Sequence, residues 1–218
     1  MFHVAVLPGD GIGPEIVESA VKVLSSAAVK YGFELDFTTY DFGGISIDKH
    51  GVPVLDSVLE ACRKSDAVLL GAVGGPEWDR LQPSLRPEAA LLRLRKEMNA
   101  FANLRPVTLY PPLQAASPLK APILERGIDI LIIRELLSGI YFGKRGTTPT
   151  YAFDTERYDN NQIEKAVRKG FAAAKLRRGK LCLVDKANVL ESSRLWRKIF
   201  FEIAREYPEV SSSALYVD

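Results

Sequence analysis

The chain has 218 residues, of which 47% are hydrophobic and 26% are charged, and its formal net charge at pH 7 is +2. This composition is typical of a globular protein, and the interspersed acidic and basic residues exclude a strongly basic nucleic-acid surface. We expect a cytoplasmic protein without membrane contact, because neither a signal peptide nor an apolar run of membrane-spanning length is visible.

The first part of the chain alternates predicted strands with predicted helices. An apolar run at His3–Leu7 predicts a buried parallel-type strand, and a helix follows that runs to about Lys30. The glycine turn between them does not fit the dinucleotide-binding fingerprint, because Pro14 stands where the third glycine would be. It is either a plain tight turn or flexible backbone that suits an anion at a helix N-terminus. We also expect a strand at 33–40, a helix at 54–64 and a buried strand at 67–73 that ends in Gly74-Gly75-Pro76.

The same alternation continues to the end of the chain. After a helix that begins at Pro87, we expect strands at 107–110 and 128–133, an exposed ribbon at 145–158, a helix at 162–177, a strand at 181–184, a helix at 191–206 and a strand at 214–217. This order predicts an α/β fold with a mostly parallel, doubly wound sheet. Cys62 and Cys182 lie far apart among apolar neighbours, so we expect reduced core thiols rather than a disulfide or a zinc site.

The helix that begins at Pro87 presents one chemically distinctive face. Glu88, Leu91, Leu92 and Arg95 fall at helical spacing, so an acid, two branched apolar groups and a guanidinium share that face. Such a face suits a ligand that has both a carboxylate and an alkyl group. The alternative is that the two leucines are ordinary core residues.

Two further arginines are candidates for the same ligand. Arg105 precedes Pro106, where the chain must be extended, and Arg134 ends the apolar run at 128–133, which predicts a buried strand. Because guanidiniums bind carboxylates in a bidentate way, three arginines suggest a small ligand with several negative charges. The alternative is that the arginines pair with acidic side chains such as Glu88 and Glu135.

A tyrosine and a lysine are candidates for acid–base chemistry. Tyr141 lies between Gly139 and Gly143, which allow sharp bends and close backbone approach. Lys186 leaves the strand at 181–184, and a partly desolvated lysine at such a strand exit can act as a base. Taken singly, each residue is better explained by an ordinary role, a capped aromatic for Tyr141 and a solvated lysine for Lys186.

Several motifs in order resemble one known family. They are LPGDGIGPE, LLGAVGGPEWD, LLRLRKE with FANLRP, IIREL with GIYFG, VDKANVLESSRLWR and the closing YVD. Along its whole length the chain resembles the isocitrate/isopropylmalate dehydrogenases, the β-decarboxylating dehydrogenase family. The resemblance implies that family's α/β fold with a mostly parallel sheet and two domains, the first incomplete. Residues 1–100 would be the N-terminal half of a cofactor-side domain, and residues 101–218 a dimerisation domain with an arm near 145–158.

The resemblance also implies roles for individual residues. By position, the family's substrate-carboxylate arginines match Arg95, Arg105 and Arg134; its acid and base match Tyr141 and Lys186; one of its metal-binding aspartates matches Asp218; positions near the nicotinamide cofactor match Gly75 and Glu88; and the pocket for an alkyl branch matches Leu91, Leu92 and the partner subunit's Val189. The implied partners are a small dicarboxylate and a second copy of the chain in a homodimer with shared active sites.

The implied activity is the oxidative decarboxylation of 3-isopropylmalate to 2-oxoisocaproate in leucine biosynthesis, with NAD and with Mg²⁺ or Mn²⁺. Isocitrate-type relatives present serine and asparagine side chains in this region to meet a third carboxylate, which Leu91 and Leu92 would leave unpaired. The alternatives are another dehydrogenase of the family, acting on tartrate, malate or homoisocitrate, and a non-catalytic protein that only binds a ligand or a partner subunit.

Two features depart from the family pattern. Leu137-Ser138 stands where the family commonly has Thr-Gly, close to Tyr141. The chain also matches only the first part of a typical member, without the further metal-binding aspartates and the loop that holds the adenosine. We therefore expect an N-terminal fragment that is inactive alone, and the choice between NAD and NADP stays open.

Overall fold

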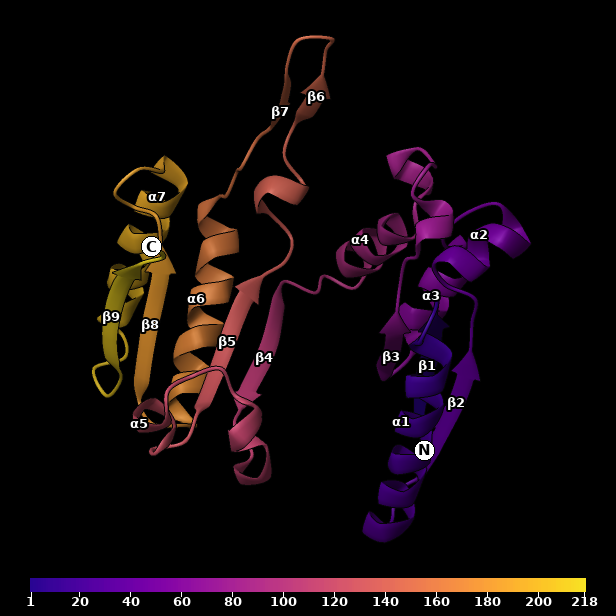
Figure 1. Ribbon diagram of the computed structural model, residues 1–218, viewed down its shortest axis with the longest axis horizontal. Helices are drawn as coiled ribbons and strands as arrows, with labels where there is room; N and C mark the ends of the chain where they lie inside the picture. Colours follow the sequence, from indigo (N-terminus) through magenta and orange to yellow (C-terminus); the bar gives the residue numbers. More distant parts are fainter. The chain divides into compact units, whose positions relative to one another are not determined.

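A computed structural model describes residues 1–218, which divide into two compact units (Figure 1). Unit 1 is Met1–Asn99 and unit 2 is Ala100–Asp218. The roles that the sequence suggests for the two parts, cofactor binding and dimerisation, stay predictions. None of the helices combines the length and the apolar character needed to cross a membrane.

Unit 1 contains a three-stranded parallel sheet with the order β2-β1-β3. Its strands are β1 (Phe2–Gly9), β2 (Leu35–Thr39) and β3 (Ala67–Ala72), and its helices are α1 (Gly13–Tyr31), α2 (Gly44–His50), α3 (Asp56–Lys64) and α4 (Pro87–Glu97), with short 3-10 turns at Pro76–Trp78 and Pro83–Leu85. The predicted strand at His3–Leu7 is confirmed as the central, most buried strand. Its residues Ala5 and Leu7 pack with Phe42, Val54 and Cys62 in the main hydrophobic core of the unit.

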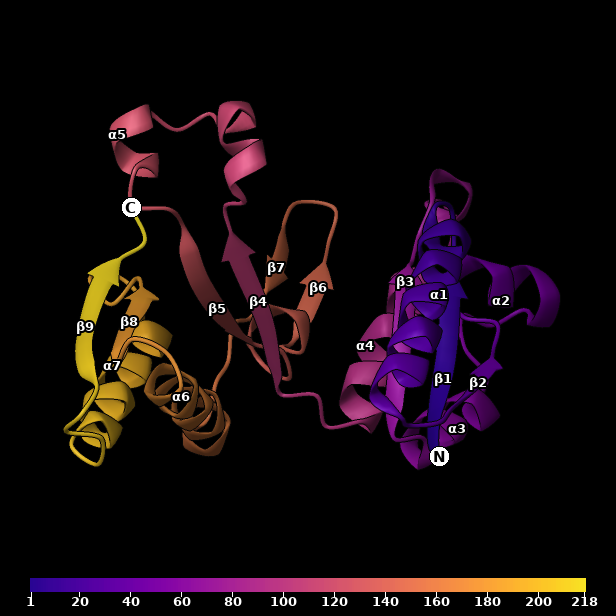
Figure 2. The ribbon, with the colours of Figure 1, turned by 90° about the horizontal axis from the view of Figure 1, so that it is seen from below.

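Unit 2 contains three two-stranded sheets and two long helices. Its strands are β4 (Ala102–Thr108), β5 (Asp129–Glu135), β6 (Arg145–Thr147), β7 (Ala152–Asp154), β8 (Lys180–Asp185) and β9 (Ser211–Tyr216), and its helices are α5 (Ala121–Leu124), α6 (Asn160–Lys175) and α7 (Glu191–Ala204), with 3-10 turns at Pro111–Ala116 and Gly139–Tyr141. Both long helices lie along one face of the strands (Figure 2). The core lies between them, around Ile163, Phe171 and Phe200.

The α/β class and the predominance of parallel pairing are confirmed, and the strands of the two units form four separate sheets. β8 and β9 pair in parallel, as do the strands of unit 1, whereas β4 pairs antiparallel with β5 and β6 antiparallel with β7. The β6–β7 ribbon lies within the segment for which an exposed ribbon is predicted, and it extends beyond the rest of unit 2 (Figure 1). Its role as a dimer arm stays a prediction.

The run at 128–133 forms a strand, as predicted, but the expectation that this strand is buried is wrong. Ile130 and Ile132 of β5 are 54% and 48% exposed. β5 pairs with β4 along one edge only, and α6 covers the strand from one side. Because successive side chains of a strand point to opposite faces, these two isoleucines occupy the face that α6 does not cover.

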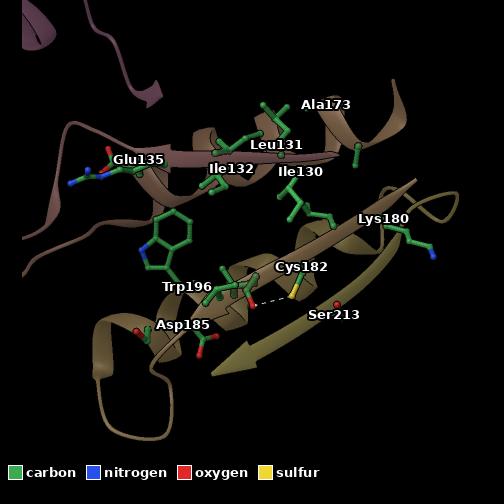
Figure 3. Close-up of a pocket in the computed structure, with 18 of the residues that line it drawn as sticks. Ile130, Leu131, Ile132, Glu135, Ala173, Lys180, Cys182, Asp185, Trp196 and Ser213 are labelled. Atoms are coloured by element: carbon green, nitrogen blue, oxygen red, sulfur yellow. Dashed lines mark hydrogen bonds between the residues drawn. The ribbon is translucent and has the colours of Figure 1, made fainter. Parts of the chain in front are cut away.

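The cysteines differ from each other, and the expectation that both are core thiols is half wrong. Both are free thiols, as expected, and Cys62 is fully buried in unit 1, where burial raises the pKa of its thiol. Cys182 is exposed and lines a cavity between β5 and β8 (Figure 3). The apolar neighbours of Cys182 in the sequence alternate across β8 and do not cover its own face of the strand.

We expect N-ethylmaleimide to modify Cys182 rapidly and Cys62 only after unfolding, because burial shields the Cys62 thiol and raises its pKa, whereas Cys182 is exposed. Peptide mass spectrometry after a short exposure of the native chain would measure this. Cys182→Ser should abolish labelling of the native chain, and labelling of Cys62 at the rate of Cys182 would contradict the burial described here.

Candidate active site

Lys186 and Asp218 meet where two parallel strands end. In the pairing of β8 with β9, Asp185 lies opposite Tyr216, and the amide of Val217 donates to the carbonyl of Asp185 at 2.9 Å. Lys186 follows Asp185 directly, and Asp218 lies two positions after Tyr216. The Lys186 ammonium contacts the Asp218 carboxylate just beyond the two strand ends. The carboxyl ends of parallel strands are the usual place for ligand sites in α/β proteins. The structure thus brings together the predicted base and the predicted metal ligand.

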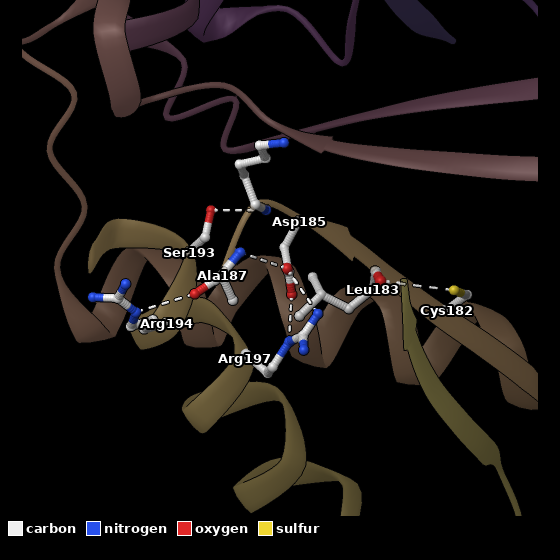
Figure 4. Close-up of polar contacts among 8 residues, drawn as sticks. Cys182, Leu183, Asp185, Ala187, Ser193, Arg194 and Arg197 are labelled. Carbon is white, nitrogen blue, oxygen red and sulfur yellow. Dashed lines mark hydrogen bonds and ion pairs between the residues drawn. The ribbon is translucent and has the colours of Figure 1, made fainter. Parts of the chain in front are cut away.

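The loop after β8 is held by the first turns of α7 (Figure 4). The Lys186 amide donates to the Ser193 hydroxyl at 3.2 Å, and Arg194 Nε donates to the Ala187 carbonyl at 3.1 Å. Within the loop, the Val189 amide donates to the Lys186 carbonyl at 3.0 Å, and the Val189 side chain is exposed. Val189 is therefore a surface residue of this chain, which a role toward a second subunit requires.

Arg105 and Arg134 lie on one face of the β4–β5 ribbon. The antiparallel register places Arg105 opposite Ile132 and Asn103 opposite Arg134. The two arginines are therefore diagonal neighbours, a relation in which Cβ atoms lie about 7–8 Å apart. Arg105 Nε donates to Asn103 Oδ1 at 2.6 Å, which holds this guanidinium along the ribbon.

Arg134 is also close to the predicted acid. Its guanidinium lies over the ring of Tyr141, 5.6 Å from the ring centroid, and the Tyr141 side chain is half exposed. The Arg145 guanidinium donates to the Tyr141 carbonyl. Arg134 is exposed and forms no ion pair with Glu135, so both its expected burial and the alternative of such a pair are wrong.

Glu135 instead shapes the turn that carries Tyr141. Its carboxylate accepts hydrogen bonds from the amides of Leu137 at 2.7 Å and Ser138 at 3.1 Å. The next residue, Gly139, has a φ of 74°, and a side chain there would collide with the Tyr158 hydroxyl. The departure from the family at Leu137-Ser138 thus lies in a turn fixed by backbone hydrogen bonds. The Ser138 hydroxyl is buried in that turn without a hydrogen-bond partner.

Tyr158 packs beside this turn and differs electrostatically from Tyr141. Burial raises its pKa, and the negative charges of Glu156 and Glu135 raise it further, whereas the positive charge of Arg134 lowers it. Tyr158 therefore stays protonated beside the turn at neutral pH.

A cavity of about 980 Å³ lies between β5 and β8 (Figure 3). Its walls are the facing strands together with Gly170, Ala173 and Ala174 of α6. Arg134 and Tyr141 contribute to its lining, whereas Arg105, Lys186 and Asp218 do not. The cavity thus adjoins only part of the predicted site, and its lining mixes apolar side chains of the strands with charged and polar ones.

In unit 1, α4 separates its core residues from its predicted ligand residues. Ala90 and Leu94 are buried in the main core of the unit. Leu91, Leu92 and Arg95 are half-buried. The fully buried face of α4 is thus offset from the leucines for which a substrate pocket is predicted.

The glycines that follow β3 lie beside Glu88. Gly74 has a φ of 104°, which favours glycine, and a Cβ added there would lie 2.7 Å from Glu88 Oε1. The bare backbone at Gly74 lets the exposed Glu88 carboxylate lie against the strand exit, whereas Gly75 lies against Glu77 and Trp78. Such a carboxylate can accept hydrogen bonds from ribose hydroxyls or a carboxamide, so these residues fit part of a nicotinamide cofactor.

Asp10 is a residue of this region that sequence reasoning missed. Its buried carboxylate accepts hydrogen bonds from the amides of Gly44, Ile45 and Gly74 at 2.8, 2.9 and 2.9 Å. It therefore ties the end of β1 to the start of α2 and to the glycine turn after β3. The only signal in the sequence was the position of Asp10 between two glycines, and this position does not predict which groups bind its carboxylate.

A divalent cation fits these residues only in part. Asp218 offers one exposed carboxylate, whereas Mg²⁺ takes about six oxygen ligands in octahedral geometry. No group of three or more His, Cys, Asp or Glu side chains in residues 1–218 could hold a metal ion. The described residues do not by themselves enclose a cation.

Comparison with known proteins identifies similar chains. Residues 3–218 match the family model described as isocitrate/isopropylmalate dehydrogenase. The 3-isopropylmalate dehydrogenase of Clostridium pasteurianum is 50% identical over 221 residues, which cover 100% of this chain and 62% of that protein. The chain thus spans about three fifths of the length of the curated relatives it matches.

Two solved structures share the architecture. The β-decarboxylating dehydrogenase of Thermococcus kodakarensis in its apo form has a TM-score of 0.75 and 33% identity, and the match covers 100% of this chain and 58% of that one. The isocitrate dehydrogenase of Methylococcus capsulatus has a TM-score of 0.81 and 28% identity, with coverage of 100% and 61%.

The burial pattern of α4 predicts different costs for two leucine substitutions. Leu94→Ala should lower the free energy of unfolding by about 2–5 kcal/mol, because it leaves a cavity in the core of unit 1. Leu91→Ala should cost clearly less, because its side chain is only half-buried. Urea unfolding of the two variants would measure both values, and equal losses would make Leu91 a core residue.

Proposed function

Since the chain belongs to the isocitrate/isopropylmalate dehydrogenase family, we propose that it carries out the NAD-dependent oxidative decarboxylation of 3-isopropylmalate in leucine biosynthesis. The observation that carries this proposal is the contact between Lys186 and Asp218 at the ends of β8 and β9. A base beside a carboxylate at a strand exit suits the removal of a proton from a 2-hydroxy acid. The protein would act in the cytoplasm.

The arginines and leucines account for the substrate class. We assign Arg95, Arg105 and Arg134 to the two carboxylates, and the shared face of the last two on the β4–β5 ribbon supports this assignment. Leu91 and Leu92, with Val189 of a second copy, would contact the isopropyl group. Half-buried leucines offer apolar surface without being part of the core, which supports such a role.

The chemistry divides between proton transfers by the protein and hydride transfer to NAD. Lys186 takes the proton of the C2 hydroxyl as the C2–H bond breaks and a carbonyl forms. NAD⁺, when held near Gly75 and Glu88, would supply the acceptor for the hydride that leaves C2. The C3 carboxylate then leaves as CO₂, its bonding electrons pass to the enolate, and Tyr141 delivers a proton to C3. The products are 2-oxoisocaproate, CO₂ and NADH.

The cofactor and the partner follow the same assignment. Gly75 and Glu88 would lie near the nicotinamide end of NAD. Asp218 would be one ligand of Mg²⁺ or Mn²⁺, with the other ligands outside the set described above. The proposed assembly is a homodimer in which Lys186 and Asp218 serve the neighbouring active site and the arm near 145–158 forms part of the contact.

We expect Lys186→Ala and Tyr141→Phe each to lower kcat by roughly 10²-fold or more, the usual effect of losing a positioned base or acid. The assay is NADH formation from 3-isopropylmalate with Mg²⁺, in a protein of full family length that begins with these 218 residues. Tyr31→Phe, which alters an exposed tyrosine at the end of α1, is the matched control. An unchanged kcat under chemistry-limited conditions would remove the substituted residue from the mechanism.

The leucine assignment predicts a change in substrate preference. Leu91→Ala or Leu92→Ala should reduce the ratio of kcat/KM for 3-isopropylmalate over malate by about 10–200-fold, the effect of lost apolar contact in a pocket. Arg95→Ala should depress both substrates together, because both present the carboxylate it would bind. A leucine variant that is less stable but keeps the ratio would show that the leucine serves only packing.

A further inference from the structure

We propose that Arg197, through Asp185, is a positioning residue that sets the contact between Lys186 and Asp218. The catalytic meaning of this inference rests on the proposed function, but its geometric content does not. Arg197 lies on α7 and is not one of the residues for which a role in binding or chemistry is expected.

Asp185 is a buried residue that hydrogen-bonds to the chain just beyond the ends of both β8 and β9. Its side chain is only 3% exposed, and its carboxylate accepts from Arg197 Nε and Nη2 at 2.8 Å each. The Ala187 amide donates to the same carboxylate at 2.9 Å, so the backbone on the far side of Lys186 is bound to it. A bidentate pair fixes orientation as well as distance.

The second strand end is attached through both backbone and side chain. The carbonyl of Asp185 accepts from the Val217 amide at 2.9 Å, directly before Asp218. The Arg197 guanidinium lies over the ring of Tyr216, 4.6 Å from its centroid. One guanidinium therefore binds Asp185, the residue before Lys186 (Figure 4), and also contacts Tyr216, two positions before Asp218.

Helix α7 makes this arrangement rigid. Ser193 and Arg197 are four residues apart and so share one face of the helix. Ser193 accepts from the Lys186 amide, while Arg197 binds Asp185. Both lie on a helix whose other side is anchored in the core by Ile199 and Phe200. A single packed helix, α7, thus holds the backbone on either side of Lys186 and contacts the strand end that leads to Asp218.

A zero-length cross-link measures the predicted contact without substrate or activity. A carbodiimide activates a carboxylate, and a lysine amine in contact displaces the resulting urea to form an amide. The yield of the Lys186–Asp218 cross-link in the 218-residue chain, measured by peptide mass spectrometry, reports their proximity. In the Asp218→Asn variant, any remaining cross-link comes from the α-carboxylate of residue 218, so this variant measures how much that group adds to the yield. The Lys175–Glu209 pair, at 2.7 Å, is the internal reference.

Arg197→Met should lower the Lys186–Asp218 yield by about tenfold or more, since reaction between two held groups depends steeply on their geometry. Arg197→Lys should retain an intermediate yield, because an ammonium keeps the charge but not the two-pronged contact. Lys198→Met, which removes a neighbouring exposed cation of α7, should change nothing.

If Arg197→Met fails to fold, the double variant Asp185→Asn with Arg197→Met removes both charges and leaves no unpaired buried carboxylate. It should show the same loss while the Lys175–Glu209 yield stays constant. A folded variant of either kind with the wild-type Lys186–Asp218 yield would overturn the inference. Because the measurement needs no catalysis, a failure of the proposed function would leave this result unaffected.

Discussion

The parallel pairing of β8 with β9 is the constraint on which the candidate site depends. Parallel strands deliver their carboxyl ends to the same edge, so residues far apart in the chain become neighbours there. The register sets Asp185 opposite Tyr216, and Lys186 and Asp218, which lie just beyond the two strand ends, meet there through their side chains. A different register would carry one strand end past the other and separate the base from the acid.

The second element of the site uses the opposite kind of pairing for a similar purpose. In the antiparallel β4–β5 ribbon, Arg105 pairs with Ile132, which lies two residues before Arg134. Arg105 and Arg134 therefore occupy the same face of the ribbon. The turn after β5 then folds back under the control of Glu135 and brings Tyr141 against Arg134. Guanidiniums beside a phenol suit the binding and protonation of a carboxylate substrate, which is the basis of the proposed roles.

Local sequence patterns predicted the elements well where a chemical signal marks their ends. The helix expected at 162–177 is observed at Asn160–Lys175, where Asp159 and Gln162 form a reciprocal capping box. The strand expected at 107–110 instead covers Ala102–Thr108. Pro106 lies inside this strand, where it is tolerated because β4 pairs along only one edge.

The contacts that position the candidate residues were not predictable from local pattern. Asp185 and Arg197 are twelve residues apart, and only the packing of α7 against β8 brings them together. Asp10 likewise binds amides that follow it by 34 to 64 residues. By contrast, Lys186, Tyr141 and the arginines were singled out from the sequence because motif order carries information about chemistry that periodicity does not. Their roles remain proposals.

The preference of the full-length protein among 2-hydroxy acids with two or three carboxylates tests the central claim most directly. The measurement is kcat/KM for 3-isopropylmalate, isocitrate and tartrate, with NAD and Mg²⁺, in a protein of full family length that begins with these 218 residues. The account predicts that 3-isopropylmalate is strongly preferred, because two leucines offer no partner for a third carboxylate or an additional hydroxyl. Equal or faster turnover of tartrate or isocitrate would contradict it.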